Sequence, residues 1–116
     1  MKRKHLTVAE RTTYRSLEDV VGCKWSASVV AAIERGVRRP GELERFIPGI
    51  SAKILHERLR RLAEYGLIDR TEPATSSAVA HVEYVLTPTG RRLASVIAQL
   101  RELQVEHDAG GMVTPP

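Results

Sequence analysis

Charged side chains recur at helical spacing between residues 51 and 64, and they are the groups in this chain best suited to bind another molecule. On a helix they would share one outward face, formed by Lys53, Glu57, Arg60 and Glu64. Leucines at 55, 59 and 62 recur at intervals of four and three, and they predict a buried stripe on the opposite side. Lysine and arginine on an exposed helix can donate hydrogen bonds to phosphate oxygens and to base edges. The stretch therefore predicts a surface helix whose polar face is suited to nucleic acid.

Turn and capping residues bound this helix at both ends. Pro48-Gly49 is a turn signal, and Ser51 can accept a hydrogen bond from a free amide of the first helical turn. Gly66 can adopt the left-handed conformation that ends a helix. A capped helix entered through a Pro-Gly turn is typical of the second helix of a helix-turn-helix, whose outward face reads the major groove.

No cluster of residues in the sequence predicts catalysis or a metal site. The four histidines stand far apart, without partners at metal-ligand spacing: His5, His56, His81 and His107. Cys23 is the only cysteine, which excludes an internal disulfide and a cysteine-based zinc site. Since no histidine or acid is placed to activate it, we favour a small structural thiol over a redox switch. We expect a protein that is not an enzyme and uses no cofactor.

The composition indicates one globular domain. The chain has 116 residues and a mass of 12.9 kDa, which is too little for two independent cores. The net charge of +4 and the pI near 9.6 favour a polyanionic partner if the basic groups gather on one face. No apolar run approaches the ~20 residues that cross a bilayer, and no signal-peptide pattern follows the basic start. We therefore expect a cytoplasmic protein.

Three helical segments are predicted before residue 48. Residues 1–13 are interpreted as a flexible basic arm. A short helix is expected from Ser16 to about Gly22, and a second from Trp25 to Arg35, in which the tryptophan anchors the core. A third helix would begin at Pro40, and its inward-facing residues are Leu43, Phe46 and Ile47. Arg38 and Arg39 stand just before it, where they could reach the backbone of DNA.

The segment after Gly66 predicts a hairpin and a long last helix. Strands are expected over residues 67–72 and 82–86, joined by a small polar tip. Thr87-Pro88 signals a helix start, and the apolar positions that follow are Leu93, Val96, Ile97, Leu100 and Leu103. This stripe exceeds what a small core can use, so we expect the helix to pair with a copy of itself. The globular domain is assigned to residues 14–106, and residues 107–116 are expected to form a disordered tail.

Several short motifs along the chain have the order and spacing of a known family. They are Gly22-Cys23-Lys24-Trp25, Arg39-Pro40-Gly41-Glu42-Leu43, Pro48-Gly49-Ile50-Ser51-Ala52-Lys53, Arg58-Leu59-Arg60, Gly66-Leu67-Ile68 and residues 82–91. On these motifs, residues 17–103 resemble the HxlR-type winged helix-turn-helix transcriptional regulators, relatives of the MarR group. The chain departs from the family at residues 11–13, where many members carry a sensing cysteine, and at Cys23, where glycine is usual. His81 also replaces a basic residue that often precedes the second strand.

The resemblance implies a dimer that binds operator DNA. The implied DNA-binding residues are Ser51, Ala52, Lys53, His56, Glu57, Arg58 and Arg60, with Arg38 and Arg39 before the third helix. Arg58 matches an arginine of the family motif, and its position beside the leucine stripe indicates packing, phosphate binding or both. The wing would carry Ser76, Ser77 and His81. The dimer interface would combine the first and last helices through Leu17, Val20, Leu93, Val96, Ile97, Leu100 and Leu103. The fold class is thus mainly α with a small β-hairpin, a winged helix-turn-helix with terminal helices for dimerisation.

We predict a homodimeric, sequence-specific transcriptional regulator that binds double-stranded DNA at a pseudo-palindromic operator. Its half-sites would lie about one helical turn, ~34 Å, apart. The alternative is a winged-helix module for protein interaction without specific DNA binding, which the mixed charge of residues 53–64 keeps open. A ligand-responsive regulator would additionally need a small-molecule effector, for which the sequence shows no pocket.

Overall fold

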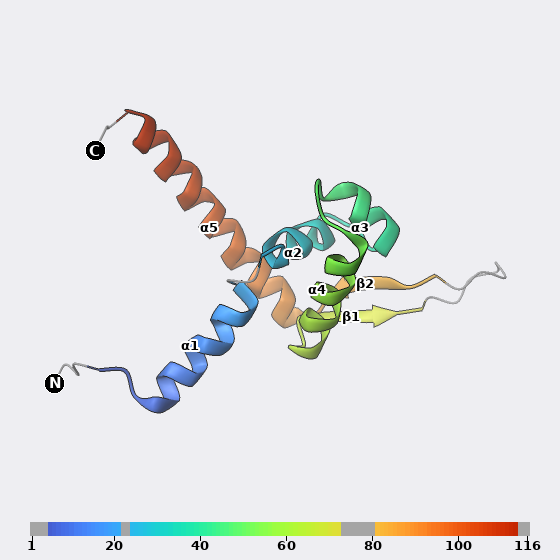
Figure 1. Ribbon diagram of the computed structural model, residues 1–116, viewed down its shortest axis with the longest axis horizontal. Coiled ribbons are helices and arrows are strands. Elements are labelled where there is room, and N and C mark those ends of the chain that lie inside the picture. Colours follow the sequence, from blue (N-terminus) through green and yellow to red (C-terminus); the bar gives the residue numbers. More distant parts are fainter. Residues whose placement is uncertain (1–4, 22–23, 73–80, 114–116) are drawn as a thin grey trace.

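The protein folds into a lobe from which two helices project. The computed structural model describes residues 5–21, 24–72 and 81–113, with side chains for 5–15, 24–72 and 81–109. Its elements in chain order are α1 (Val8–Val21), α2 (Ser26–Glu34), α3 (Pro40–Phe46), α4 (Ala52–Glu64), β1 (Ile68–Thr71), β2 (Glu83–Leu86) and α5 (Pro88–Val113). Figure 1 shows α1 and α5 leaving the lobe on the side opposite the hairpin. The predicted fold class, mainly helical with a small antiparallel hairpin, is confirmed.

The core lies where α2, α3 and α4 meet the hairpin. Its fully buried side chains are Val29, Val30, Leu43, Leu55, Leu59, Leu62 and Ile68. Each buried leucine stabilises the fold by about 1.5–3 kcal/mol relative to an exposed one. The predicted stripe of α4 is therefore the part of that helix that holds it to the lobe. Trp25 is half-buried and packs against this core.

One predicted core residue faces solvent. Phe46 is 45% exposed, whereas Leu43 and Ile47 are buried. Helix α3 ends at Phe46, and Ile47 adopts an extended conformation at its C-terminus. The chain thus turns Ile47 into the core and leaves Phe46 outside, which regular helical spacing does not predict.

Helix α4 has the predicted caps at both ends. Ser51 Oγ accepts a hydrogen bond from the Ile54 amide at 3.2 Å. Gly66 has a φ of 73°, and its amide donates to the Ala63 carbonyl at 3.0 Å. The Leu67 amide reaches back to the Leu62 carbonyl, also at 3.0 Å. These two bonds form a Schellman cap, so the helix that carries the polar face has a fixed length and direction.

The hairpin follows this cap directly and is tied to the segment before α3. Ile68 pairs with Leu86, and Thr71 pairs with Glu83. Strand β1 begins one residue later than predicted because the Leu67 amide serves the helix cap. On the outer edge of β2, the Tyr84 amide donates to the Arg38 carbonyl at 2.8 Å. This bond seats the hairpin beside the helix-turn-helix formed by α3 and α4.

Helix α1 begins at Val8, not at Ser16, so residues 8–13 are helical where an arm was predicted. A capping box explains the early start. The Glu10 amide donates to Thr7 Oγ1 at 3.0 Å, while the Thr7 amide donates to Glu10 Oε1 at 2.9 Å. This reciprocal pair satisfies free amides at the helix start. The acceptor role of Glu10 lowers the pKa of its carboxyl, chiefly through the Thr7 backbone amide and secondarily through the Thr7 side chain.

Helix α5 is also longer than predicted, because it runs through residues 107–113, which were expected to be disordered. No proline occurs between Pro88 and Pro115, so every residue from 89 to 113 can donate its amide to the helix. The glycines at 110 and 111 weaken a helix by about 1 kcal/mol each but do not remove a hydrogen bond. Since adding a residue to an existing helix is much easier than starting one, the backbone hydrogen bonding of α5 can continue through both glycines.

Candidate nucleic-acid interface

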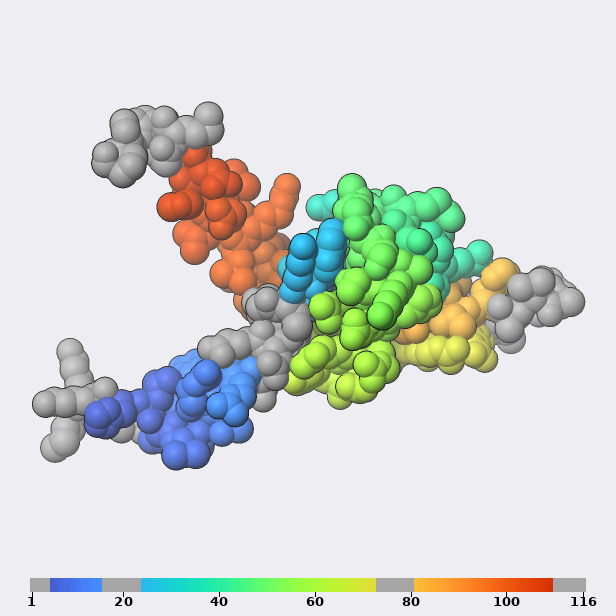
Figure 2. Space-filling model, viewed as in Figure 1, coloured from blue at the N-terminus to red at the C-terminus, as the bar shows by residue number. Residues whose placement is uncertain are grey.

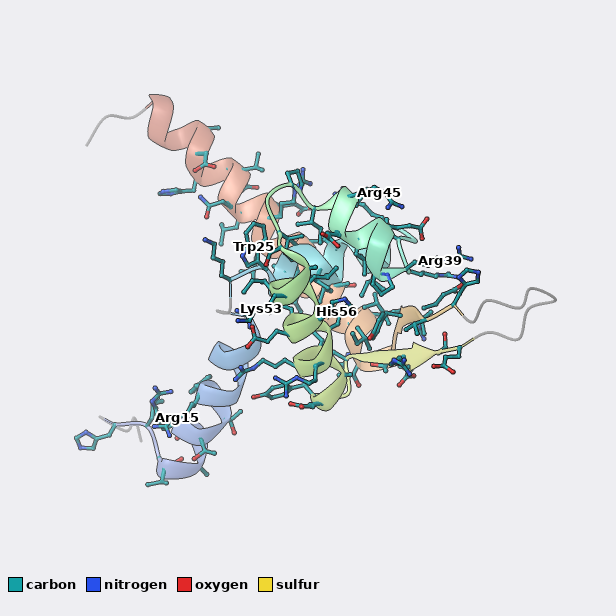
Figure 3. The ribbon with its side chains drawn as sticks, turned by 45° about the vertical axis from the view of Figure 1, so that its right-hand side comes forward. Arg15, Trp25, Arg39, Arg45, Lys53 and His56 are labelled. Atoms are coloured by element: carbon teal, nitrogen blue, oxygen red, sulfur yellow. The ribbon has the colours of Figure 1, made fainter. Side chains whose placement is uncertain are left out.

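The outer face of α4 gathers most of the predicted DNA-binding residues. Exposed side chains on this face and its cap are Ser51, Ala52, Lys53, His56, Glu57 and Arg60. Figure 2 shows α4 across the middle of one face of the lobe, with α3 beside its start and the hairpin beside its end. In Figure 3, Lys53 and His56 project from α4, while Arg15 lies apart on α1. The face is thus an accessible strip that begins at a capped helix N-terminus.

The two basic side chains of this strip, Arg60 and Lys53, differ in whether they form an ion pair. Arg60 Nη1 lies 3.6 Å from Glu64 Oε1, and both side chains are largely exposed. Such a pair contributes about 0.3–0.5 kcal/mol, so Arg60 can exchange its partner for a phosphate at small cost. Lys53 forms no ion pair with the rest of the described chain. It stands in the first turn, where the helix dipole adds positive potential. The basic potential of the strip is therefore highest near Lys53.

Arg58 lies at the side of this strip, and its side chain forms a hydrogen bond within the lobe. Its side chain is half-buried, and Nε donates to the Lys24 carbonyl at 2.8 Å. The bond joins the middle of α4 to the residue pair that precedes α2, 34 positions earlier in the chain. Arg58 therefore has an observed role inside the protein, in addition to the DNA contact that was predicted for it.

The two arginines before α3 diverge. Arg39 Nε lies 3.8 Å from Glu83 Oε2, and its side chain borders a groove of about 440 Å³ with Arg45 and His81. Arg38 instead lines a groove of about 540 Å³ between α2, β2 and α5, to which α4 contributes no residue. The extended backbone at Arg39 sends successive side chains to opposite sides. Arg39 therefore lies beside the start of β2 with Arg45 and His81, whereas Arg38 lies between the end of β2 and α5.

A further groove of about 390 Å³ separates α4 from the hairpin. It is lined by His56, Leu59, Arg60, Ala63, Glu64, Arg70 and Tyr84. Arg70 was not among the predicted site residues; it lies on the same face of β1 as the buried Ile68, and its own side chain is exposed. Arg45 on α3 was missed as well, because a lone exposed arginine carries no distinguishing pattern. Ser76 and Ser77 fall outside the described residues, and His81, two residues before β2, is half-buried.

The two projecting helices carry apolar side chains that one copy of the chain leaves uncovered. On α5, Leu93 and Ile97 pack against the core, but Val96, Leu100 and Leu103 are 48%, 47% and 61% exposed. Val105 is exposed as well, but it lies two residues after Leu103 and therefore on another side of the helix. Leu17 and Val20 lie within α1, and their side chains are outside the described set. The predicted interface on α5 thus divides into a half that anchors the helix and a half that is open.

Within the described residues, no group of three or more histidine, cysteine, aspartate or glutamate side chains could hold a metal ion. No helix among those residues is long and apolar enough to cross a membrane.

Residues 20–109 match the family model for HxlR-like helix-turn-helix proteins. The chain is 32% identical over 94 residues to the HTH-type transcriptional regulator YtfH of Escherichia coli, spanning 81% of this chain and 73% of that protein. It is 36% identical over 85 residues to the HTH-type regulator sll1512 of Synechocystis, spanning 73% of this chain and 62% of that protein. The chain thus covers less than two thirds of the cyanobacterial relative's length.

Solved structures with the same fold include a MarR-family regulator from Enterococcus faecalis, with a TM-score of 0.75 and 26% identity over 97% of this chain and all of that one. The redox regulator HypR in its reduced form matches with a TM-score of 0.73 and 28% identity over 83% of this chain and 93% of that one. The relatives are transcriptional regulators, not enzymes. The chain belongs to the HxlR-like helix-turn-helix family and is a DNA-binding transcriptional regulator.

Proposed function

We propose that the protein acts in the cytoplasm as a homodimer that binds a pseudo-palindromic operator, with one α4 in each of two successive major grooves. The observation that supports this most is the exposed polar strip of α4, held by a buried leucine stripe and fixed at both ends by caps. Phosphate contacts from basic side chains supply affinity, while the first turns of α4 read bases. Half-sites then lie ~34 Å apart.

The uncovered stripe on α5 supports the dimer. Val96, Leu100 and Leu103 recur at intervals of four and three beyond the lobe, which is the spacing of a helix that packs against another helix. An isolated chain would leave these side chains in water at a cost of about 25 cal/mol per Å² of apolar surface. A second copy of the chain can cover them and so set the separation of the two α4 helices.

DNA binding is tested by titrating the protein into labelled DNA that flanks its own gene, at several salt concentrations. We expect tight binding that weakens with salt, because basic side chains displace counterions from phosphates. Replacing Lys53 by alanine lowers operator affinity. A phosphate contact would reduce the slope of log K against log salt by about 1, and a base contact would relax sequence preference.

Arg35→Gln serves as the control, since it removes one charge from the exposed C-terminus of α2. Unchanged affinity and sequence preference in Lys53→Ala would remove Lys53 from the site. Absence of binding at low salt by the unmodified protein would instead favour a protein-interaction module.

The dimer is tested by sedimentation of a Leu100→Glu, Leu103→Glu double variant. Two carboxylates on the exposed stripe should yield monomers, because burying an unpaired charge costs several kcal/mol. Glu102→Gln, an exposed change between the two sites, should leave the dimer intact. A double variant that still sediments as a dimer would place the interface elsewhere.

A further inference from the structure

The two residues before α2 adopt a conformation that needs outside support. Trp25 has a φ of 79°, and it is the one non-glycine residue with positive φ among those that the structure describes. A bulky side chain rarely adopts this left-handed conformation, because its Cβ approaches the backbone. The conformation persists only where neighbouring groups hold it. The Lys24–Trp25 pair, which we call the junction, is therefore a point of strain between α1 and α2.

Helix α4 and the turn that precedes it supply that support. Arg58 Nε, from the middle of α4, donates to the Lys24 carbonyl at 2.8 Å. The Trp25 ring reaches the turn that leads into α4, since its Cη2 lies 3.4 Å from where a Cβ on Gly49 would stand. Lys24 Nζ lies 5.5 Å from the centre of the same ring and can stack on it. The junction thus contacts both the helix that faces DNA and the turn that aims it.

The junction also forms the start of α2. The Trp25 carbonyl accepts a hydrogen bond from the Val29 amide at 3.0 Å and so begins that helix. Helix α1, which projects from the lobe, ends at Val21, three residues before Lys24 in the sequence. The junction and the direct contact of α1 with α2 therefore both connect α1 to the lobe.

We propose that Arg58 is a positioning residue, which ties α4 to the Lys24–Trp25 junction and so fixes the angle of the recognition helix relative to α1. This rests on the proposed function, in which α1 and α5 hold two copies of the chain together. The hydrogen bond from Arg58 then makes the spacing and tilt of the two α4 helices depend on dimer geometry. Arg58 acts on the operator through the placement of Lys53 and its neighbours on α4, not through a phosphate of its own.

The experiment compares Arg58→Gln and Arg58→Lys with the unmodified protein. Operator affinity, discrimination between operator and scrambled DNA, and the salt slope are measured at a temperature where circular dichroism shows all proteins folded. Binding by the unmodified protein tests the proposed function first, separately from the role of Arg58. Arg35→Gln again controls for the loss of one positive charge.

Both Arg58 variants should bind the operator about tenfold more weakly, the loss expected for one charge-assisted hydrogen bond, while binding to scrambled DNA and the salt slope stay unchanged. Lysine should not rescue, because it keeps the charge but has the carbon Cε at the position of the arginine Nε that donates to the carbonyl. Trp25 is the only tryptophan, so its fluorescence reports on the junction, and acrylamide should quench it more readily in both variants.

Two results would overturn the proposal. A salt slope reduced by about 1 in Arg58→Gln and restored in Arg58→Lys would show a phosphate contact. Unchanged affinity and discrimination, with only a lower melting temperature, would show that Arg58 serves the stability of the lobe and nothing more.

Discussion

Replacing Gly90 by alanine should destabilise the protein, although alanine is the better helix former. Gly90 lies in the first turn of α5 and is buried against the Leu67 backbone. A Cβ at this position would stand 2.9 Å from the Leu67 carbonyl carbon and 3.4 Å from its Cα, and it would overlap the carbonyl oxygen. These atoms belong to the backbone, so no side-chain rotation can relieve the overlap.

The size of the effect follows from three contributions. Forced overpacking costs about 1–3 kcal/mol, and the upper end applies because the α5 and Leu67 backbones must separate. Separation also weakens the hydrogen bond from the Thr87 amide to the Leu67 carbonyl, now 3.0 Å, which contributes about 1 kcal/mol. Alanine offsets about 1 kcal/mol through helix propensity. The net loss is about 2–3 kcal/mol, equivalent to a melting temperature lower by about 10 °C.

Gly41→Ala provides the matched control, since Gly41 also lies in the first turn of a helix. Its nearest neighbour would be the mobile end of Arg45 at 3.6 Å, an ordinary contact. This variant should be as stable as the parent or gain up to about 1 kcal/mol. Thermal unfolding followed by circular dichroism measures both variants, at one protein concentration because the melting temperature of the proposed dimer depends on concentration. If Gly90→Ala melts at or above the parent temperature, the close packing of α5 on Leu67 is refuted.

Two further predictions concern helix starts. Ser51→Ala removes the acceptor for the Ile54 amide and should cost about 1 kcal/mol in urea unfolding, whereas Ser51→Asp should retain most of the stability; equal loss in both would argue against capping. Glu10 has a lowered pKa in the folded state, so its contribution to α1 is complete above the ordinary carboxyl value of 4.5 and is lost as the pH falls through the folded value. Helix content from circular dichroism should therefore decline in acid, and Glu10→Gln should remove part of that decline; an identical acid profile in the variant would contradict the role of the capping box.

The elements that sequence reasoning located best are those determined by local interactions. For α4, the cap acceptor, the leucine stripe and the terminating glycine all lie within the helix or beside it, so each could be recognised from spacing alone. The same local signal was present for α1, where Thr7 and Glu10 have capping-box spacing. Hydrophobic periodicity does not predict this start, because residues 8–13 lack an apolar stripe, although a capped helix needs no such stripe to begin.

The partners that the arginine side chains contact could not be predicted from local spacing. Arg58 has an ordinary position on an amphipathic helix, and its partner is a backbone carbonyl 34 residues away. Arg38 and Arg39 are adjacent in sequence, yet one lines a groove with α5 and the other approaches Glu83. A long side chain points to whichever distant element lies beside it, and that depends on the packing of the whole lobe. Spacing can therefore propose which arginines are available to DNA, but tertiary contacts decide which ones are free.

The division of charge on the lobe bears on how specificity arises. The outer strip of α4 alternates basic and acidic residues, and Arg60 forms an ion pair with Glu64. A single strip therefore offers little net attraction to phosphate. Two such strips held at a fixed separation bind as one unit, since the second contact is made at the high effective concentration set by the first. In the proposed dimer, that gain exists only if the separation is rigid, and the separation depends on α1, α5 and the contacts that connect them to α4. Two contacts should therefore matter most for DNA sequence discrimination by this weakly charged surface. One is the Arg58 hydrogen bond to the Lys24–Trp25 junction, and the other is the close packing of Gly90 on the Leu67 backbone.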